Sequence, residues 1–507
     1  MQTAATQENS LENVAREVWR GIKILSSAFL LTMTLGSAAH AELKRFDGTK
    51  VRVLTFDGPS ILEPLKRRAK EFEKLTGATV VVKSVPYADL YGKVKTDWQL
   101  NQGEIDAALI MPQWMPDFAI PGYLEELSGR MYQDSGLKSN DIAPFFSAVS
   151  QKYGSKTYLM ALDGDFHLLY YRSDILQKIG KQPPQTWDEY LEIARLTHNQ
   201  DYGDGKISGS CIAKRKGGQS YWIITTIAAS YLQSKGAQEG VFFNRGDMSP
   251  LVNNEGFTRA LEIYKESTNY GPPNEVQMDI GDTRALFIKG GCALTVDWGD
   301  IGPLAADAKK SKVVDKVGVQ ILPGSRKIVD RSTGKLISCE QDKCPFAKDG
   351  VNHAPFAAAG GWSAGISSHA DKNVKIAAYA LFSYMSQPAQ SNVDVTKGET
   401  GFNPYRFSQF MDLEPWIKSG MSMKATKAYL GAIQDSLYSQ NMVLDLRIPS
   451  NNIYQQVVLD GALAKYLEGS ADAKSTIKSI EDGWNRLTDE IGRASQLKAY
   501  LKSIGSK

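Results

Sequence analysis

Histidine, cysteine and long apolar runs are scarce in this chain of 507 residues. It contains five His and four Cys, and no CxxC motif or closely spaced His pair indicates a zinc site. The sequence therefore offers little to a metalloenzyme. An excess of one charge is also missing, since 59 Lys and Arg face 56 Asp and Glu. No basic stripe with interleaved aromatic residues occurs, which argues against nucleic acid as a partner.

Residues 1–41 have the pattern of a secretory signal. Basic residues precede the apolar run 24–35, and Gly, Ser or Ala stands at five of the six positions 36–41. The run is shorter than the roughly 20 apolar residues of a membrane helix, and no later run approaches that length. We therefore expect a cleaved signal and a soluble periplasmic chain from Glu42, without a lipid anchor because the cleavage region has no Cys. An uncleaved membrane anchor is the alternative.

The four cysteines all follow the predicted signal, and an even number in an exported chain suggests disulfides. Cys339 and Cys344 enclose a short loop that a disulfide would close, and Cys211 and Cys292 would then pair with each other. The sequence alone leaves this connectivity open.

Strands alternate with amphipathic helices from the start of the expected mature chain. The order is a strand over 51–56, a helix over 62–75, a strand over 79–85, a helix over 87–100 and a strand over 105–111. This alternation predicts an α/β fold with a parallel sheet. Without the signal, about 466 residues (507 less 41) remain, more than one core usually serves, so two lobes are expected.

Several segments occur in an order that resembles extracellular solute-binding proteins of family 1, the group that contains maltose-binding protein. The element Thr186-Trp187-Asp188-Glu189 is the most specific, and Thr186 with Glu189 also forms a capping box at a helix start. The other segments with this resemblance are 51–77, 168–174, 285–294 and 360–366.

The resemblance implies a two-lobed periplasmic binding protein fold, each lobe a mostly parallel sheet flanked by helices, with the ligand in the cleft between the lobes. Matching the segments places one lobe at 42–162 plus 362–440 and the other at 163–361 plus 441–507. It further implies a monomeric receptor, not an enzyme and without a cofactor, that captures a sugar and delivers it to the membrane permease subunits of an ABC importer. An insertion at 325–353 departs from the shorter members of the family.

A sugar site needs aromatic plates for the C–H faces and polar side chains for the hydroxyls. In the family, residues matching the aromatic candidates commonly line the cleft, although each ring alone fits a hydrophobic core. These candidates are Trp114, Tyr221, Trp222, Trp298 and Trp362. The polar candidates are Asp57, Gln113, Asp163, Asp165, Asp297 and Arg406. Ligands of parallel sheets lie beyond the carboxyl ends of strands, where Asp57, Gln113 and Trp114 fall. Arg406 fits a structural salt bridge equally well, and Asp163 with Asp165 fits a solvated turn.

Other functions compete with this interpretation. The segment 361–365 matches the G-x-S-x-G nucleophile elbow, which would make Ser363 the nucleophile of a secreted hydrolase. That mechanism needs an acid and then a later His, but His369 is the last His in the chain and Asp371 follows it. The segment 201–206 resembles a calcium loop, but positions where such a loop needs carboxylate ligands hold other residues. A receptor of the same fold for a polyol, an amine or an organic acid stays open.

Overall fold

Two β-sheets organise the residues that this computed structural model describes, 45–203 and 205–506. The predicted signal lies outside them. The first sheet has the order β2-β1-β3-β13-β6, and β1 pairs in parallel with both β2 and β3, whereas β13 runs antiparallel to β3 and β6. Its strands are β1 (Lys50–Phe56), β2 (Thr79–Val85), β3 (Ala107–Ile110), β6 (Met160–Ala161) and β13 (Ser363–Ile366).

The second sheet has the order β10-β7-β9-β8. Strands β8 and β9 are parallel, and β7 runs antiparallel to β9 and β10. The strands are β7 (Leu168–Arg172), β8 (Ser208–Cys211), β9 (Cys292–Asp297) and β10 (Val317–Gln320). The expected α/β fold with two sheets is therefore present, and in each sheet one strand, β13 or β7, runs against the others.

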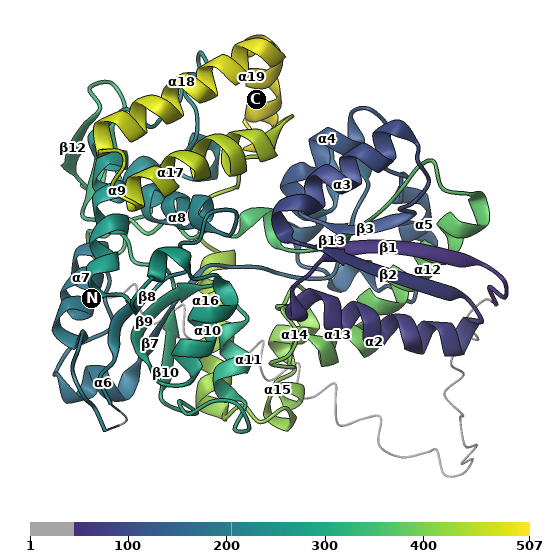
Figure 1. Ribbon diagram of the computed structural model, residues 1–507, viewed down its shortest axis with the longest axis horizontal. Helices are drawn as coiled ribbons and strands as arrows, with labels where there is room; N and C mark the ends of the chain where they lie inside the picture. The colour runs from purple at the N-terminus through teal and green to yellow at the C-terminus, as the bar shows by residue number, and fades with distance from the viewer. Residues whose placement is uncertain (1–44, 204, 507) are drawn as a thin grey trace, which may run out of the picture. The chain divides into compact units, whose positions relative to one another are not determined.

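Helices cover both faces of the first sheet (Figure 1). Helix α2 (Pro59–Thr76) contacts β1, β2 and α12 (Lys372–Ser386) on one side, and α3 (Tyr87–Leu100) contacts β1 and β3 on the other. Helix α2 buries Leu65 and Phe72 against the sheet and ends at Gly77, whose φ of 74° suits a residue without a Cβ atom. The strands and helices predicted up to residue 111 are thus confirmed, with shifts of a few residues at their ends.

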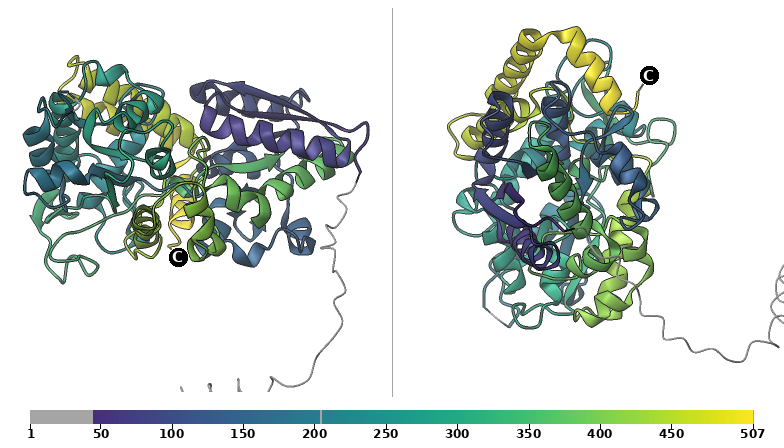
Figure 2. Two further views of the ribbon diagram at one scale, coloured as in Figure 1. Left: turned by 90° about the horizontal axis from the view of Figure 1, so that it is seen from below. Right: turned by 90° about the vertical axis from the view of Figure 1, so that its right-hand side faces the viewer.

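The second sheet carries a larger helical layer. Helix α7 (Trp187–Thr197) begins at Thr186 with the predicted capping box. Helix α8 (Ser220–Leu232) is buried throughout and packs on α9 (Glu255–Ser267). Of the C-terminal helices, yellow in Figures 1 and 2, the first packs on α8, the second on α9, and the third on the second. They are α17 (Asp460–Leu467), α18 (Ala473–Ile491) and α19 (Arg493–Ser503).

Shorter elements complete the described part of the chain. The helices are α4 (Met115–Ala119), α5 (Ser128–Gln133), α6 (Ser173–Lys178), α10 (Ile280–Ile288), α11 (Ile301–Ala306), α13 (Pro388–Asp394), α14 (Phe407–Met411) and α15 (Glu414–Lys418). Strands β4 (Lys152–Tyr153) and β5 (Lys156–Thr157) form a small hairpin. No helix among the described residues is both long and apolar enough to cross a bilayer.

The exact lobe boundaries stay a prediction, but one helix differs from it. Helix α16 (Met423–Leu437) falls in the range 362–440 that we assigned to the first lobe, yet it packs against β10 of the second sheet. The sequence motifs stop near residue 406 and therefore could not place this helix.

Two disulfides confirm the suggested pairing. Cys211 and Cys292 join the neighbouring strands β8 and β9, and we call this bond the core disulfide. Cys339 and Cys344 form the hairpin disulfide. It lies in the insertion 325–353, just after the hairpin of β11 (Lys327–Asp330) and β12 (Lys335–Ser338).

Candidate functional site

Aromatic side chains gather at the carboxyl ends of the parallel strands of the first sheet. Phe56 is the last residue of β1 and stacks on Trp362, with 4.8 Å between ring centroids and 16° between ring planes. Tyr87, two residues after β2, meets Trp362 edge-on at 6.1 Å and lies 6.0 Å from Trp114. Ligand sites of parallel sheets form at this edge.

The rings continue from the first lobe to the second. Tyr87 lies 5.8 Å from Trp222, and its hydroxyl is 2.8 Å from the hydroxyl of Tyr221. Trp222 in turn meets Trp298, which follows β9, edge-on at 5.2 Å. We call these residues the aromatic cluster: Phe56, Tyr87, Trp114, Tyr221, Trp222, Trp298 and Trp362. All five aromatic residues predicted from the sequence belong to it, and Phe56 and Tyr87 were missed although both stand at strand ends.

Unpartnered polar atoms lie in the same region. Gln113, in the turn Pro112–Trp114 after β3, is fully buried, and neither atom of its amide has a hydrogen-bond partner within the described residues. The hydroxyls of Thr55 and Ser363 are buried and unpartnered in the same sense. Buried polar groups in proteins almost always find a partner. Asp57 differs, because it is exposed and accepts a hydrogen bond from Ser84 at 3.3 Å.

Asp163 joins three segments of the chain that meet between the sheets. Its carboxylate accepts hydrogen bonds from the backbone N–H groups of Gly164 at 2.7 Å, Asn403 at 2.7 Å and Trp362 at 3.1 Å. A Cβ atom at Gly361 would lie 2.6 Å from the Asp163 carboxylate, so this close approach requires glycine. Burial raises the pKa of Asp163 to about 7. Asp163 is thus fixed by the protein rather than placed in a solvated turn.

Asp165 shares the same surroundings. Its carboxylate accepts a hydrogen bond from the Asn403 side chain at 2.9 Å. Burial, followed by the neighbouring Asp163 and Asp300 carboxylates, raises its pKa well above the usual range. Both candidates lie between β6 of the first sheet and β7 of the second.

The acidic candidate Asp297 is neutralised by a buried ion pair. Asp297 lies 2.8 Å from the guanidinium of Arg284, which also contacts Asp300 at 2.9 Å. Burial raises the pKa of Asp297, and the neighbouring Arg284 opposes that shift. Asp297 also accepts the backbone N–H of Trp298 at 2.6 Å, so it orients the loop that carries this ring.

Arg406 makes the structural contacts that the sequence left as an alternative. Its side chain is fully buried, and its guanidinium donates to the carbonyl groups of Leu137 at 3.0 Å and Lys138 at 3.2 Å. It also forms an ion pair with Asp141 at 3.4 Å. These partners hold the loop 137–141, and none of them belongs to the aromatic cluster.

Three polar residues that the sequence analysis missed contact the cluster. The indole N–H of Trp298 donates to Gln219 at 2.8 Å, and that of Trp222 donates to Asp445 at 2.9 Å. The His167 ring lies 3.6 Å from the Trp298 ring, centroid to centroid. None of the three belongs to a local motif, and Asp445 is over 200 residues away from Trp222 in the sequence. Only the folded chain brings them together.

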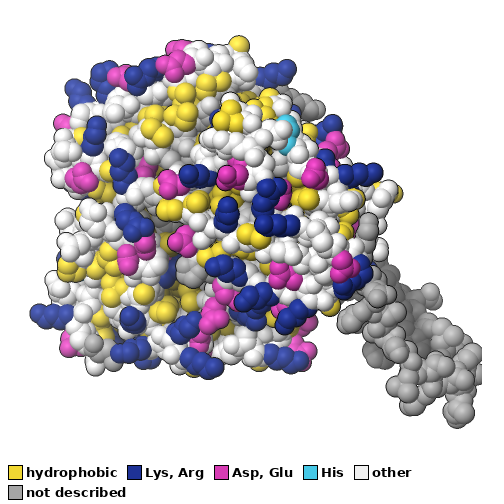
Figure 3. Space-filling view, turned by 45° about the vertical axis from the view of Figure 1, so that its right-hand side comes forward, with side chains coloured by type: hydrophobic (Ala, Val, Ile, Leu, Met, Phe, Trp, Pro, Cys, Tyr) yellow, Lys and Arg dark blue, Asp and Glu magenta, His cyan; other side chains and the backbone are white. Residues whose placement is uncertain are grey.

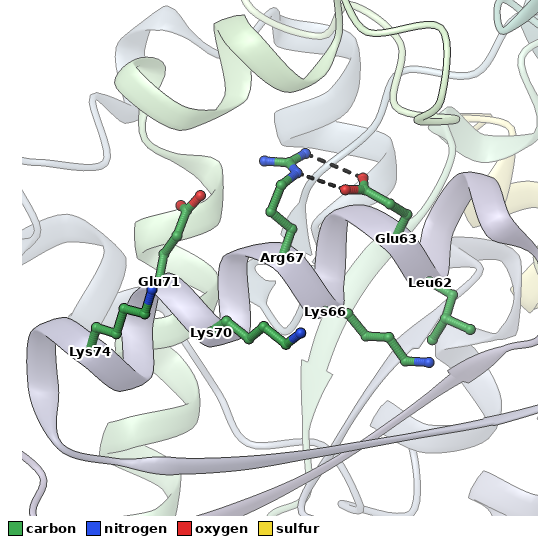
Figure 4. Close-up of a pocket in the computed structure, with 7 residues that line it drawn as sticks. All are labelled: Leu62, Glu63, Lys66, Arg67, Lys70, Glu71 and Lys74. Atoms are coloured by element: carbon green, nitrogen blue, oxygen red, sulfur yellow. Dashed lines mark hydrogen bonds and ion pairs between the residues drawn. The ribbon is translucent and has the colours of Figure 1, made fainter.

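A hollow of about 620 Å³ elsewhere follows the outer face of α2. Figure 4 shows an ion pair between Glu63 and Arg67 on one side of the helix and the side chains of Lys66, Lys70 and Lys74 on the other. Leu62 and Glu71 complete its lining. This surface is charged and has no aromatic side chain, so it does not resemble the site expected for a sugar.

The competing interpretations find no matching geometry in the described residues. Ser363 begins strand β13, whereas a nucleophile elbow places its Ser on a turn between a strand and a helix. The His369 ring lies 6.2 Å from the Tyr123 ring, centroid to centroid, and the Ser363 hydroxyl has no hydrogen-bond partner among the described residues. Nowhere in 45–203 or 205–506 do three His, Cys, Asp or Glu residues come together as metal ligands.

Comparison with known proteins gives consistent relatives. A mannitol-binding protein of Pseudomonas aeruginosa is 27% identical over 282 residues, which cover 54% of this chain and 60% of the relative. A probable ABC transporter-binding protein of Deinococcus radiodurans is 25% identical over 279 residues, which cover 53% of this chain and 63% of the relative. The matched part is thus about three fifths of the length of these curated relatives.

Solved structures share the fold at lower identity. A solute-binding protein of Agrobacterium radiobacter K84 in complex with ribitol has a TM-score of 0.70 at 20% identity, with 87% of this chain and 100% of that chain covered. A solute-binding protein of Agrobacterium vitis S4 with bound D-mannitol has a TM-score of 0.68 at 17% identity, with 88% and 99% covered.

The sequence profile of the bacterial extracellular solute-binding proteins matches residues 58–391, well over half of the 507 residues. Together with the two-lobed fold, this match shows that the chain belongs to the bacterial extracellular solute-binding protein family.

Proposed function

We propose that this protein captures a neutral polyhydroxylated solute, a sugar or a polyol, against its aromatic cluster and delivers it to the membrane subunits of an ABC importer. The observation that carries the proposal is the continuous set of rings from both lobes with the unpartnered amide of Gln113 beside it. Rings cover the C–H faces of such solutes, and amides and hydroxyls pair with their hydroxyl groups. Relatives named for mannitol and ribitol support this class.

The charges around the cluster favour a neutral solute over an amine or an organic acid. Asp297 is paired with Arg284, and Asp163 accepts three backbone N–H groups. Asp445 accepts from Trp222 and from Gln455, the latter at 2.6 Å. The charged side chains that contact the cluster are therefore matched by protein partners. An ionic solute would be buried without a countercharge from them, which is costly.

The lobes proposed here follow the two sheets. The first comprises about 42–162 plus 362–422, and the second comprises about 163–361 plus 423–507, because α16 packs on β10. Closing of the lobes by hinge motion would bring the two halves of the cluster together on the solute. We expect the protein to act as a periplasmic monomer without catalysis or a cofactor, after removal of residues 1–41.

The surface supports a small-molecule receptor rather than a nucleic-acid-binding protein. On the face shown in Figure 3, Lys and Arg side chains are interspersed with Asp and Glu side chains. Formal charge over the whole chain is only +3. A nucleic-acid site would need a stripe of basic residues.

A thermal-shift screen tests the proposal. D-mannitol, ribitol and maltose are compared with amines and organic acids, and a true ligand at a hundredfold excess over its Kd should stabilise the native protein by about 2.7 kcal/mol. Trp298→Ala and Trp362→Ala should remove the shift. Trp484→Ala is the matched control, because Trp484 is equally buried but packs on Phe243, away from the cluster. A shift with charged solutes alone would reject the proposed class.

A further inference from the structure

His167 lies beside the cluster at the entry of strand β7. Its side chain is fully buried, and its backbone N–H donates to the Phe356 carbonyl at 3.0 Å. The ring packs against Trp298 at 3.6 Å between centroids. Neither the sequence motifs nor the proposed function gives this residue a role.

One ring nitrogen is fixed and the other is not. Nδ1 lies 2.7 Å from the hydroxyl of Thr226 on α8. Thr226 is one helical turn after Trp222, so α8 holds the imidazole next to the rings of the cluster. Nε2 is buried and has no hydrogen-bond partner within the described residues. Burial, and then the charge of Arg284, lowers the pKa of His167 well below its usual value, so the ring is neutral.

A second unpartnered polar atom lies on the same indole. Gln219 uses its Oε1 atom to accept the indole N–H of Trp298 at 2.8 Å, while its Nε2 atom is buried without a partner in the part of the chain that the structure describes. His167 and Gln219 thus both contact Trp298, and each has one buried polar atom without a hydrogen-bond partner. Such atoms are costly to bury unless something binds them.

We infer that His167 is a solute-binding residue whose Nε2 atom forms a hydrogen bond with one hydroxyl of the solute held on Trp298. The inference rests on the proposed function and names a residue that discriminates among its solutes. A neutral imidazole presents either an acceptor or a donor at Nε2, depending on its tautomer, and a hydroxyl matches both. A solute with hydrogen in place of that hydroxyl would leave Nε2 unpaired, and sites built this way reject such analogues.

The first test uses the unaltered protein. Imidazole nitrogens are labelled with ¹⁵N, which gives few signals because the whole chain has five His. The protein is then saturated with whichever of D-mannitol, ribitol and maltose stabilises it. We expect the Nε2 resonance of His167 to move, while its Nδ1 resonance, held by Thr226, stays in place. An unmoved Nε2 resonance in the saturated protein overturns the inference but leaves the proposed function standing.

The second test is a cycle between variants and analogues. His167→Phe keeps a ring on Trp298 and removes the nitrogen, so it should weaken binding of the full solute about 3- to 10-fold. His167→Gln should recover part of that loss. The loss of affinity caused by His167→Phe should vanish for the one monodeoxy analogue that lacks the paired hydroxyl. An equal loss of affinity for all analogues contradicts the inference.

His353→Phe is the control. Its Nδ1 atom also has a protein partner, the Leu322 carbonyl at 2.9 Å, but this partner lies outside the aromatic cluster. The affinity of the His353→Phe variant for the solute should match that of the unaltered protein. If none of the three probes stabilises the unaltered protein, the proposed function and this inference fail together.

Discussion

The hydrogen bond between Tyr87 and Tyr221 gives a direct test of lobe closure. Tyr87 begins α3 in the first lobe, Tyr221 lies on α8 in the second, and 2.8 Å separates their hydroxyls. Burial raises the pKa of both phenols, so both are neutral donors and acceptors. The amide of Gln456 reaches the Tyr221 hydroxyl at 3.4 Å and is a weaker second partner. The main contact is therefore one neutral hydrogen bond across the cleft.

Its magnitude follows from what each variant leaves behind. A buried hydrogen bond between neutral groups contributes about 1 kcal/mol, and a hydroxyl left alone costs more than one removed with its partner. Tyr87→Phe and Tyr221→Phe should therefore each weaken solute binding roughly 5- to 10-fold. The double variant should lose less than the product of the two single losses, with a coupling of about 1 kcal/mol.

Isothermal titration with the solute found by thermal shift measures the four affinities. We expect the contact to form only when the lobes close, so urea unfolding without solute should change little. Tyr454→Phe is the matched control, since its hydroxyl bonds Thr488 at 2.9 Å within the second lobe. Unchanged affinities in both single variants, or purely additive losses in the double variant, would refute the reasoning.

Three further predictions concern other parts of the molecule. Asp117 accepts the backbone N–H of Ser450 at 3.0 Å, just before a helical segment. Asp117→Asn removes the negative charge at the start of this segment and should raise the Kd for the solute about 2- to 5-fold, measured by calorimetry. An unchanged Kd would exclude this effect. The core disulfide spans 81 residues of sequence and the hairpin disulfide spans 5. Replacing the two Cys by Ser should therefore lower the free energy of unfolding by about 4.5 kcal/mol for the core disulfide and by about 2 kcal/mol for the hairpin disulfide. The reverse order in urea titrations would contradict this. Burial raises the folded pKa of Asp445 to about 6, so the protein loses stability as the pH rises from about 4 to about 6, and Asp445→Asn should remove that loss of up to about 3 kcal/mol. A stability difference that is independent of pH would argue against a raised pKa.

Local patterns were enough for the elements of the first lobe. The apolar run 51–56 predicts a buried strand, and the helical spacing of apolar residues in 62–75 predicts a helix with one buried face. Both elements lie within a few residues of the prediction. The capping box at Thr186 is likewise complete within four residues. These features depend on neighbours in the chain, which a sequence displays directly.

The five predicted aromatic residues lie together because each stands next to one end of a strand or at the start of a helix. Their polar partners were harder to predict. Asp297 and Arg406 are the polar residue types that a sugar site uses, but the structure pairs them with Arg284 and Asp141. Residue type alone does not distinguish a side chain kept for a ligand from one already neutralised, because the partner that decides it comes from a distant segment.

The sequence by itself determined the α/β class, the family, the order of the early elements and the rings of the site, since periodicity, caps and motifs are properties of short segments. Tertiary structure decided the place of α16, the burial of Asp163 among three backbone donors, and the contacts of His167 and Gln219 with Trp298. These depend on contacts between residues far apart in the chain. Such contacts form only when burial of the two sheets brings those segments together, and no local pattern records them.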